Sequence, residues 1–131
     1  MFQLRLAAQP AALSLIRERL RQWLMTHRWP DAEIQDLMLA VSEAASNVVD
    51  HAYLHAAPGD IEITGRITVD SGGARIAELT VLDRGRWRPP PEQADNRRRG
   101  IPLMEAAVAE LVIDGTDHGT CVRLRGRSVG Q

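Results

Sequence analysis

The amino-acid sequence predicts an α+β fold, a two-layer sandwich in which helices cover one face of a mixed, mostly antiparallel sheet. Three observations lead to this prediction. The chain has 131 residues, which suits a single domain over residues 1–131. Apolar residues recur at strand spacing in some segments and at helix spacing in others. The predicted elements follow one another as strand, two helices, strands, helix and strands, an order that favours helices on one face of a shared sheet.

The first half of the chain predicts an edge strand and two helices. Residues 2–7 alternate apolar and polar, as a half-buried strand does. Residues 11–24 follow Pro10 and form an amphipathic helix, with an apolar stripe of Leu13, Ile16, Leu20 and Trp23. Pro30 interrupts the helical pattern, and a second helix runs from about residue 31 to about residue 53. Its apolar stripe comprises Ile34, Leu37, Met38, Val41, Ala45 and Val48.

The second half predicts four strands and one helix. Residues 61–70 and 76–83 are strands, joined by a glycine-containing turn. Residues 84–100 are rich in arginine and proline and show no period, so we expect a loop there, and loops of this length are commonly functional or disordered. Residues 101–111 predict the third helix. Two short strands close the chain around the turn at residues 115–119.

Composition excludes several classes of site. All sixteen basic residues are arginine, so neither a P-loop nor a lysine Schiff base is available. The net charge of -1 gives no support for direct nucleic-acid binding. Cys121 is the single cysteine, which excludes an internal disulfide and suits a reducing compartment. No apolar run is long enough to span a membrane and no signal peptide opens the chain, so we expect a cytoplasmic protein.

A glutamate and an asparagine share one side of the second predicted helix. Glu43 and Asn47 are four residues apart, so their side chains point in the same direction. An amide oxygen is a suitable Mg²⁺ ligand, and a carboxylate one turn away can accept a proton from an attacking hydroxyl. Such pairs also occur by chance on solvated helix faces. The pair alone therefore leaves both interpretations open.

Three further segments suit a nucleotide. Asp83 ends an apolar strand and is followed by Gly85, so its carboxylate can accept a hydrogen bond from the amine of adenine at a place where a ligand can approach the backbone. The arginines at 97–99 and Gly100 lead into a helix, whose amino terminus attracts phosphate. A glycine and Thr120 open the last strand. Each segment also has an ordinary structural explanation as a turn, a solvated loop or a hairpin.

Taken in order, these motifs resemble those of the GHKL nucleotide-binding fold (the Bergerat fold), which gyrase, Hsp90, histidine kinases and MutL share. Residues 43–47 (EAASN) resemble its N box, residues 83–85 (DRG) its first glycine box, residues 99–104 (RGIPLM) its second, and residues 119–120 (GT) its third. The whole stretch AVSEAASNVVDHAY, residues 40–53, is similar to the anti-sigma-factor serine/threonine kinases of bacteria. The resemblance covers nearly the whole chain.

The resemblance implies a role for each matching residue. It implies that Glu43 deprotonates the substrate hydroxyl, that Asn47 binds Mg²⁺, and that Asp83 recognises adenine. Gly85 would leave room for the base, and Thr120 would belong to the same polar cluster.

For the phosphates, the resemblance implies a lid over residues 86–99, and Gly100 begins the helix terminus that binds them. Arg98 and Arg99 would contribute positive charge. The implied cofactors are ATP and Mg²⁺. The implied partners are an antagonist protein of the STAS type, which receives the phosphate, and a sigma factor, with a homodimer as a further possibility.

One departure keeps a second interpretation open. Arg98 stands where many relatives have a glycine, and arginine can bind phosphate by charge but lacks the backbone freedom of glycine. The alternative is therefore a non-catalytic regulatory module of the same fold with weak or no kinase activity. A third interpretation is that the motifs coincide by chance in an unrelated α/β domain. His51 and His55 are also one turn apart, but no third metal ligand is apparent in the sequence.

Overall fold

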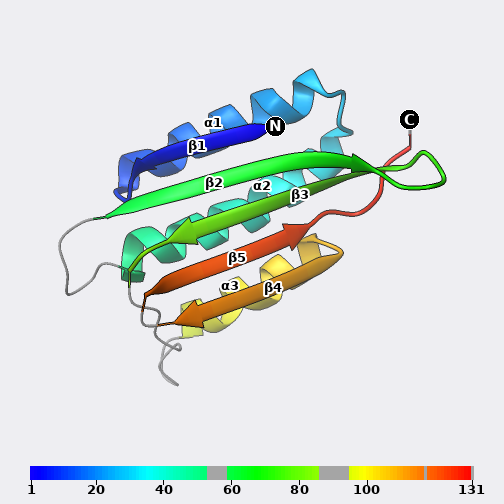
Figure 1. Ribbon diagram of the computed structural model, residues 1–131. Coiled ribbons are helices and arrows are strands. Elements are labelled where there is room, and N and C mark those ends of the chain that lie inside the picture. Colours follow the sequence, from blue (N-terminus) through cyan, green and yellow to red (C-terminus); the bar gives the residue numbers. More distant parts are fainter. Residues whose placement is uncertain (53–58, 86–94, 117, 131) are drawn as a thin grey trace.

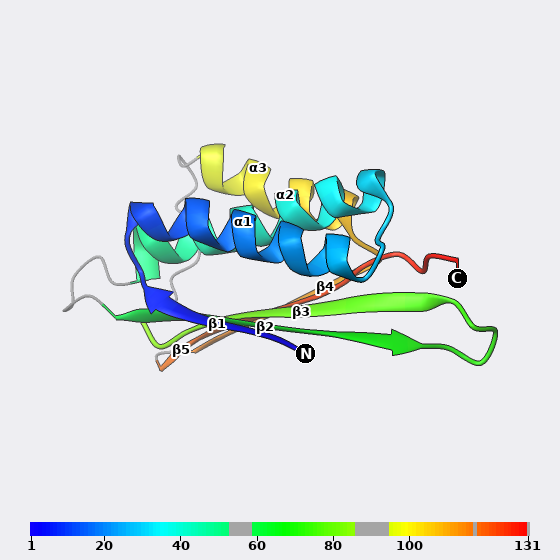
Figure 2. The same ribbon diagram turned by 90° about the horizontal axis from the view of Figure 1, so that it is seen from above.

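Three α-helices lie across one face of a five-stranded sheet (Figures 1 and 2). The computed structural model describes residues 1–52, 59–85, 95–116 and 118–130. The elements in chain order are β1 (Phe2–Ala7), α1 (Pro10–Thr26), α2 (Asp31–Asn47), the π-helical turn η1 (Val48–Ala52), β2 (Asp60–Val69), β3 (Arg75–Asp83), α3 (Asp95–Ala107), β4 (Glu110–Thr116) and β5 (Gly119–Arg125). This architecture confirms the predicted fold class.

The strand order is β1-β2-β3-β5-β4, with β1 and β4 at the two edges. All four pairings between these strands are antiparallel, so the described sheet is more uniform than the predicted mixed one. The predicted edge position of residues 2–7 and the closing hairpin of β4 and β5 are confirmed. Antiparallel neighbours need only short turns, and the glycine-containing turn after β2 is of this kind.

The core lies between the helices and the sheet. The predicted apolar stripe of α2 is buried along its whole length, and Leu37 is inaccessible to solvent. The stripe of α1 is displaced from the predicted one, because Ala12 and Leu24 are buried whereas Leu13 and Trp23 are only partly covered. Trp23 lies at the flank of the core, where its ring packs against Phe2 at a centroid distance of 5.4 Å. None of the described helices combines the length and the apolarity that crossing a bilayer requires.

The third helix differs most from its prediction. We expected a loop up to Gly100 and a helix over residues 101–111, but α3 begins at Asp95 and ends at Ala107. No proline interrupts residues 95–100, and arginine is a good helix former, so the arginine run continues the helix instead of preceding it. Pro102 lies inside the helix, where it leaves one backbone carbonyl of the preceding turn without its helical N–H donor.

Arg75 of β3 and Arg127, which follows β5, cap the carboxyl ends of helices. Arg75 donates to the carbonyl oxygens of His27 and Arg28 after α1, at 2.6 and 3.4 Å. Arg127 donates to the carbonyl of Ala106 in α3 at 2.7 Å and forms an ion pair with Asp36 of α2 at 3.0 Å. The last turns of these helices contain no basic residue of their own. The long-range arginines therefore satisfy carbonyl groups that a helix end leaves free.

We expect Arg127→Ala to lower the free energy of unfolding by about 1 kcal/mol, because it removes a charge-assisted hydrogen bond and a half-exposed ion pair. Arg125→Ala is the matched control, since the ion pair of Arg125 with Glu110 is long, at 4.0 Å, and exposed. We expect this substitution to lower the free energy of unfolding by less than about 0.5 kcal/mol. Urea unfolding of both variants measures the difference. Equal losses would show that Arg127 does not fasten α3 to α2.

Candidate functional site

The segments that carry the four motifs meet at one end of the molecule. Figures 1 and 2 show that α2 ends, α3 begins, β3 ends and β5 begins at the same end of the sheet. The antiparallel order requires this, because β3 and β5 run in opposite directions and pair Asp83 with Thr120. Residues far apart in the sequence are thereby brought to a common end.

Asp83 is the buried acid of this end. Asp83 is 4% exposed. It lies on the same face of β3 as Val81, so its side chain points to the side of the sheet that carries the helices. The backbone N–H of Gly85 donates to Oδ1 at 2.9 Å, and the backbone N–H of Thr120 also donates to the carboxylate. Burial raises the pKa of Asp83, and the two hydrogen bonds lower it in part. The group is therefore a positioned acceptor in a poorly solvated place.

The first residues of β5 lie unusually close to the end of β3. Gly119 has a φ of 147°, and a Cβ added there would lie 2.2 Å from the backbone oxygen of Asp83. No side chain fits into that space, so a glycine is needed for β5 to begin here. Thr120 is buried beside Asp83. Gly119 belongs to the predicted third glycine box, where we gave it no role of its own, and its close contact with Asp83 now supplies one.

Glu43 and Asn47 are half-buried on α2, and the neighbouring helices define the direction in which they point. Asp36, Glu43 and Asn47 belong to one helical stripe at spacings of seven and four. Asp36 is bound to Arg127, which also binds the carboxyl end of α3. On the other side of α2, Ser42 accepts a hydrogen bond from Arg17 of α1 at 3.2 Å. Glu43 and Asn47 therefore face the side of α2 on which α3 lies.

The helix changes its winding directly after Asn47. The next five residues, Val48–Ala52, form the π-helical turn η1, and the backbone N–H of Val48 contacts the carbonyls of both Ala44 and Ala45. π-Helical turns are rare and occur preferentially at functional sites. The turn lies at the same end of the molecule as the close of β3 (Figure 1).

The remaining predicted site residues are described only in part. Gly85 is buried and hydrogen-bonded to Asp83. Arg98, Arg99 and Gly100 lie in the first turns of α3, so the prediction that Gly100 begins the helix is wrong, and their side chains are outside the described part of the structure. Residues 86–94 of the predicted lid and residues 53–58, including Tyr53 and His55, are also outside it.

Comparison with known proteins identifies the family of the chain. Residues 6–126 match the family described as the histidine kinase-like ATPase domain. The chain belongs to this family. Within the curated proteins, the serine-protein kinase RsbW of Bacillus subtilis (strain 168) is 32% identical over 119 residues, which cover 83% of this chain and 74% of RsbW. This similarity places the chain among the anti-sigma-factor kinases, and it supports ATP use and a kinase-type activity.

Solved structures show the same fold. A structure of the RsbU and RsbW domains of Rv1364c from Mycobacterium tuberculosis matches 98% of this chain with a TM-score of 0.70 and 25% identity. The histidine kinase domain of a blue-light activated kinase from Erythrobacter litoralis EL346 matches 74% with a TM-score of 0.56 and 26% identity. This chain covers 33% of the first structure and 45% of the second, so it corresponds to one part of each.

We expect Gly119→Ala to lower the free energy of unfolding by roughly 1–3 kcal/mol, because the new Cβ collides with the backbone of Asp83 at a φ that other residues rarely adopt. Gly130→Ala is the control, since a Cβ there meets nothing within 4 Å. Urea unfolding compares the two variants. If both leave the free energy unchanged, the close approach of β5 to β3 is not a constraint.

The raised pKa of Asp83 predicts a pH-dependent contribution to stability. The folded chain keeps this proton to a higher pH than the unfolded chain does, so the contribution is complete at low pH and is lost as the pH rises through the folded-state pKa. The free energy of unfolding of the natural chain, minus that of Asp83→Asn, should therefore fall as the pH rises above about 4, the ordinary pKa of aspartate. Urea titrations at several pH values test this. An increase would mean that the hydrogen bonds from Gly85 and Thr120 outweigh burial.

Proposed function

We propose that this chain is an ATP-dependent serine/threonine protein kinase that acts as an anti-sigma factor. It would phosphorylate an antagonist protein of the STAS type and sequester a sigma factor. The observation that supports the proposal is that α2, which carries Glu43 and Asn47 in its last turns, ends at the same end of the sheet as the buried Asp83 (Figure 1). The similarity to RsbW, which is a serine-protein kinase by name, supports a hydroxyl as the acceptor.

The adenine would bind at the end of β3. Asp83 already accepts two backbone hydrogen bonds, and a carboxylate offers about four acceptor positions, so it can also accept from the exocyclic amine of adenine. Its poor solvation strengthens such a bond relative to one in water. Gly85 provides backbone without a side chain next to the base, and Thr120 is the neighbouring hydroxyl.

The phosphates would lie between α2 and the first turns of α3. Asn47 would supply the protein ligand of Mg²⁺, with phosphate and water oxygens as the others, since Mg²⁺ keeps several waters in such sites. Among the described residues, no cluster of three His, Cys, Asp or Glu side chains forms a separate metal site. Arg98 and Arg99 in the first turns of α3 would balance phosphate charge together with the free N–H groups of the helix start, and Gly100 beside them has no side chain that would obstruct the ligand.

Glu43 would act as the base. It lies one turn before Asn47 on the same stripe, so a metal held by Asn47 and the hydroxyl deprotonated by Glu43 would be neighbours. Phosphoryl transfer requires mainly positioning and charge neutralisation, which this arrangement supplies. The reaction would take place in the cytoplasm, with a protein partner and without direct contact with nucleic acid or membrane.

A second candidate is a regulatory module of the same family without transfer activity. Arg98 favours it, because a position that is glycine in many relatives carries a bulky side chain here. Calorimetric titration with ATP, with and without Mg²⁺, distinguishes weak or absent nucleotide binding from the binding that a kinase needs.

We expect Glu43→Gln to lower the rate of phosphate transfer from ATP to an STAS-type antagonist by roughly 100-fold or more, because it removes the proton acceptor. The affinity for Mg-ATP should change by less than about threefold, since the variant keeps the size of the side chain. Radiolabel transfer and calorimetry measure the two quantities. Glu33→Gln, in the first turn of the same helix, is the control. Loss of ATP binding in Glu43→Gln alone would assign Glu43 to binding instead of catalysis.

A further inference from the structure

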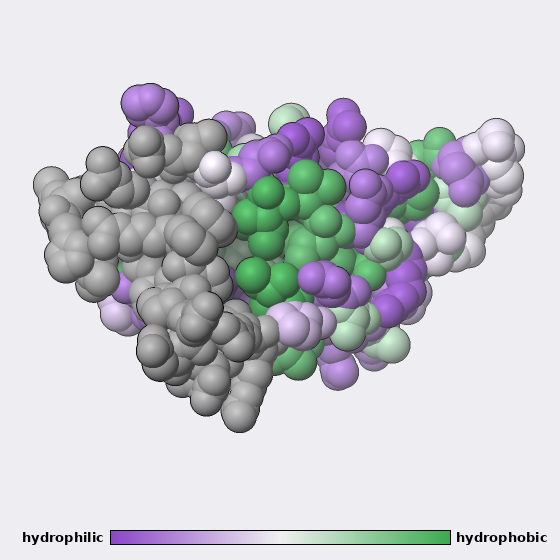
Figure 3. Space-filling model, turned by 90° about the horizontal axis from the view of Figure 1, so that it is seen from below, coloured by the Kyte–Doolittle hydropathy of each residue, from purple (hydrophilic) through white to green (hydrophobic). Residues whose placement is uncertain are grey.

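Apolar side chains gather at the edge of the molecule where α3 lies beside β4. Leu103 of α3 is 44% exposed and Val112 of β4 is 38% exposed, and Leu111 and Ile113 are only partly covered. Figure 3 shows this band as a continuous hydrophobic area on that side of the molecule. Leu111 and Ile113 pair with buried core residues of β5 and therefore face the helices, whereas Val112 faces the other side of the sheet. The edge strand thus presents apolar groups on both of its faces.

The same strand has unpaired backbone groups. β4 pairs with β5 on one side, and in the described part of the chain no strand pairs with the other side (Figure 1). Every second residue of an antiparallel edge strand directs its N–H and C=O away from the sheet, and these groups can accept a further strand.

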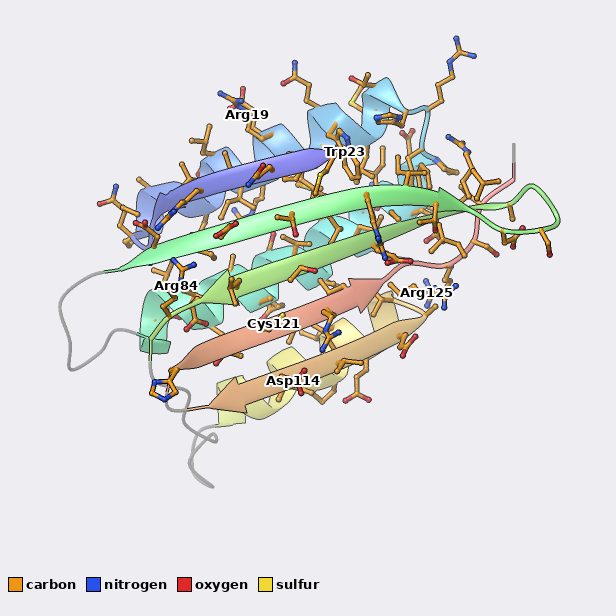
Figure 4. The ribbon with its side chains drawn as sticks, viewed as in Figure 1. Arg19, Trp23, Arg84, Asp114, Cys121 and Arg125 are labelled. Carbon is orange, nitrogen blue, oxygen red and sulfur yellow. The ribbon has the colours of Figure 1, made fainter. Side chains whose placement is uncertain are left out.

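The charged side chains that the edge strand β4 itself contributes are acidic. Residues 101–116 contain Glu105, Glu110 and Asp114 and no basic residue. Glu110 and Asp114 form ion pairs with Arg125 and Arg123 of β5, but their side chains remain 60% and 59% exposed. Figure 4 shows Asp114 and Arg125 on the bare face of the sheet. Both acidic side chains can therefore interact with further cations that approach along the free edge.

A second copy of the chain that pairs symmetrically about Val112 does not fit this edge. In a symmetric antiparallel pairing of two β4 strands about Val112, Glu110 of each copy lies opposite Asp114 of the other copy, which gives two repulsive pairs. Like charges directly opposite each other destabilise a strand pair. A strand that carries basic residues at those two positions replaces the repulsion with attraction.

We propose that the free edge of β4 is a docking site for an extended basic segment of a partner protein, which adds to the sheet as a sixth strand. In antiparallel pairing, the residues opposite Asp114 and Glu110 are Arg or Lys, and the three residues between them are apolar. The outer two of these three lie against Ile113 and Leu111 on the helix side, and the middle one lies against Val112. Backbone hydrogen bonds supply affinity, and the alternating side chains supply selectivity.

The test uses a synthetic peptide, Thr-Arg-Val-Val-Val-Arg-Thr, and a charge-reversed peptide with Glu in place of both Arg. We expect the first peptide to shift the backbone amide resonances of residues 110–116, and to bind about tenfold more tightly than the second at low salt. Shifts confined to the β1 edge or to the helices, equal affinities of the two peptides, or no binding at millimolar peptide would overturn the proposal. So would concentration-dependent shifts of the β4 amides without peptide, because they would assign the edge to a second copy.

Val112→Arg supplies the matched variant. It places a positive charge and a long side chain at the centre of the edge, and we expect it to weaken binding of the first peptide by about tenfold. Val69→Arg is the control, since Val69 is 64% exposed at the hairpin that ends β2, away from β4. Urea unfolding checks that both variants are folded. Equal binding by Val112→Arg and the natural chain would contradict the proposal.

Discussion

The candidate site depends on one close contact, between the first residue of β5 and the last residue of β3. Without a Cβ at Gly119, β5 can begin directly against the backbone of Asp83. The pairing of Asp83 with Thr120 follows, and with it the second backbone hydrogen bond to the Asp83 carboxylate. A larger residue would separate the two strand ends, expose the carboxylate to water and remove the positioned acceptor. The polar end of the sheet thus depends on the absence of one side chain.

The opposite end of the molecule is fastened by arginines. Arg75 and Arg127 bind the carboxyl ends of α1 and α3, both of which lie away from the candidate site (Figure 1). The carboxyl end of α2 points towards the site and continues into the π-helical turn. Rigid attachment at one end leaves the groups at the other end free for a ligand. Arginine suits this attachment better than lysine would, because its planar guanidinium can donate to two carbonyl groups at once.

Local sequence patterns predicted the strands and α2 well, because their alternation and spacing reflect burial on one face. Arg97, Arg98 and Arg99 show the limit of such reasoning. A run of charge looks like a solvated loop, but arginine has a high helix propensity, and α3 extends through it. The displaced stripe of α1 has another cause, since whether Trp23 or Leu24 enters the core depends on how the helix is rotated over β1 and β2. Periodicity alone does not determine that rotation.

The electrostatics of the site end explain why the proposed nucleotide would need a metal ion. Glu43, Asp83 and the negative end of the α2 dipole all lie at this end, and together they repel a triphosphate. Asn47 is neutral, so it can bind a cation without adding to that repulsion. Under the proposed function, the positive charge would come from Mg²⁺ and from the arginine-rich start of α3, whose dipole has the opposite direction. Adenine recognition at the acidic strand end and phosphate binding at the helix start would thereby be separated in space, which would fix the direction in which ATP lies.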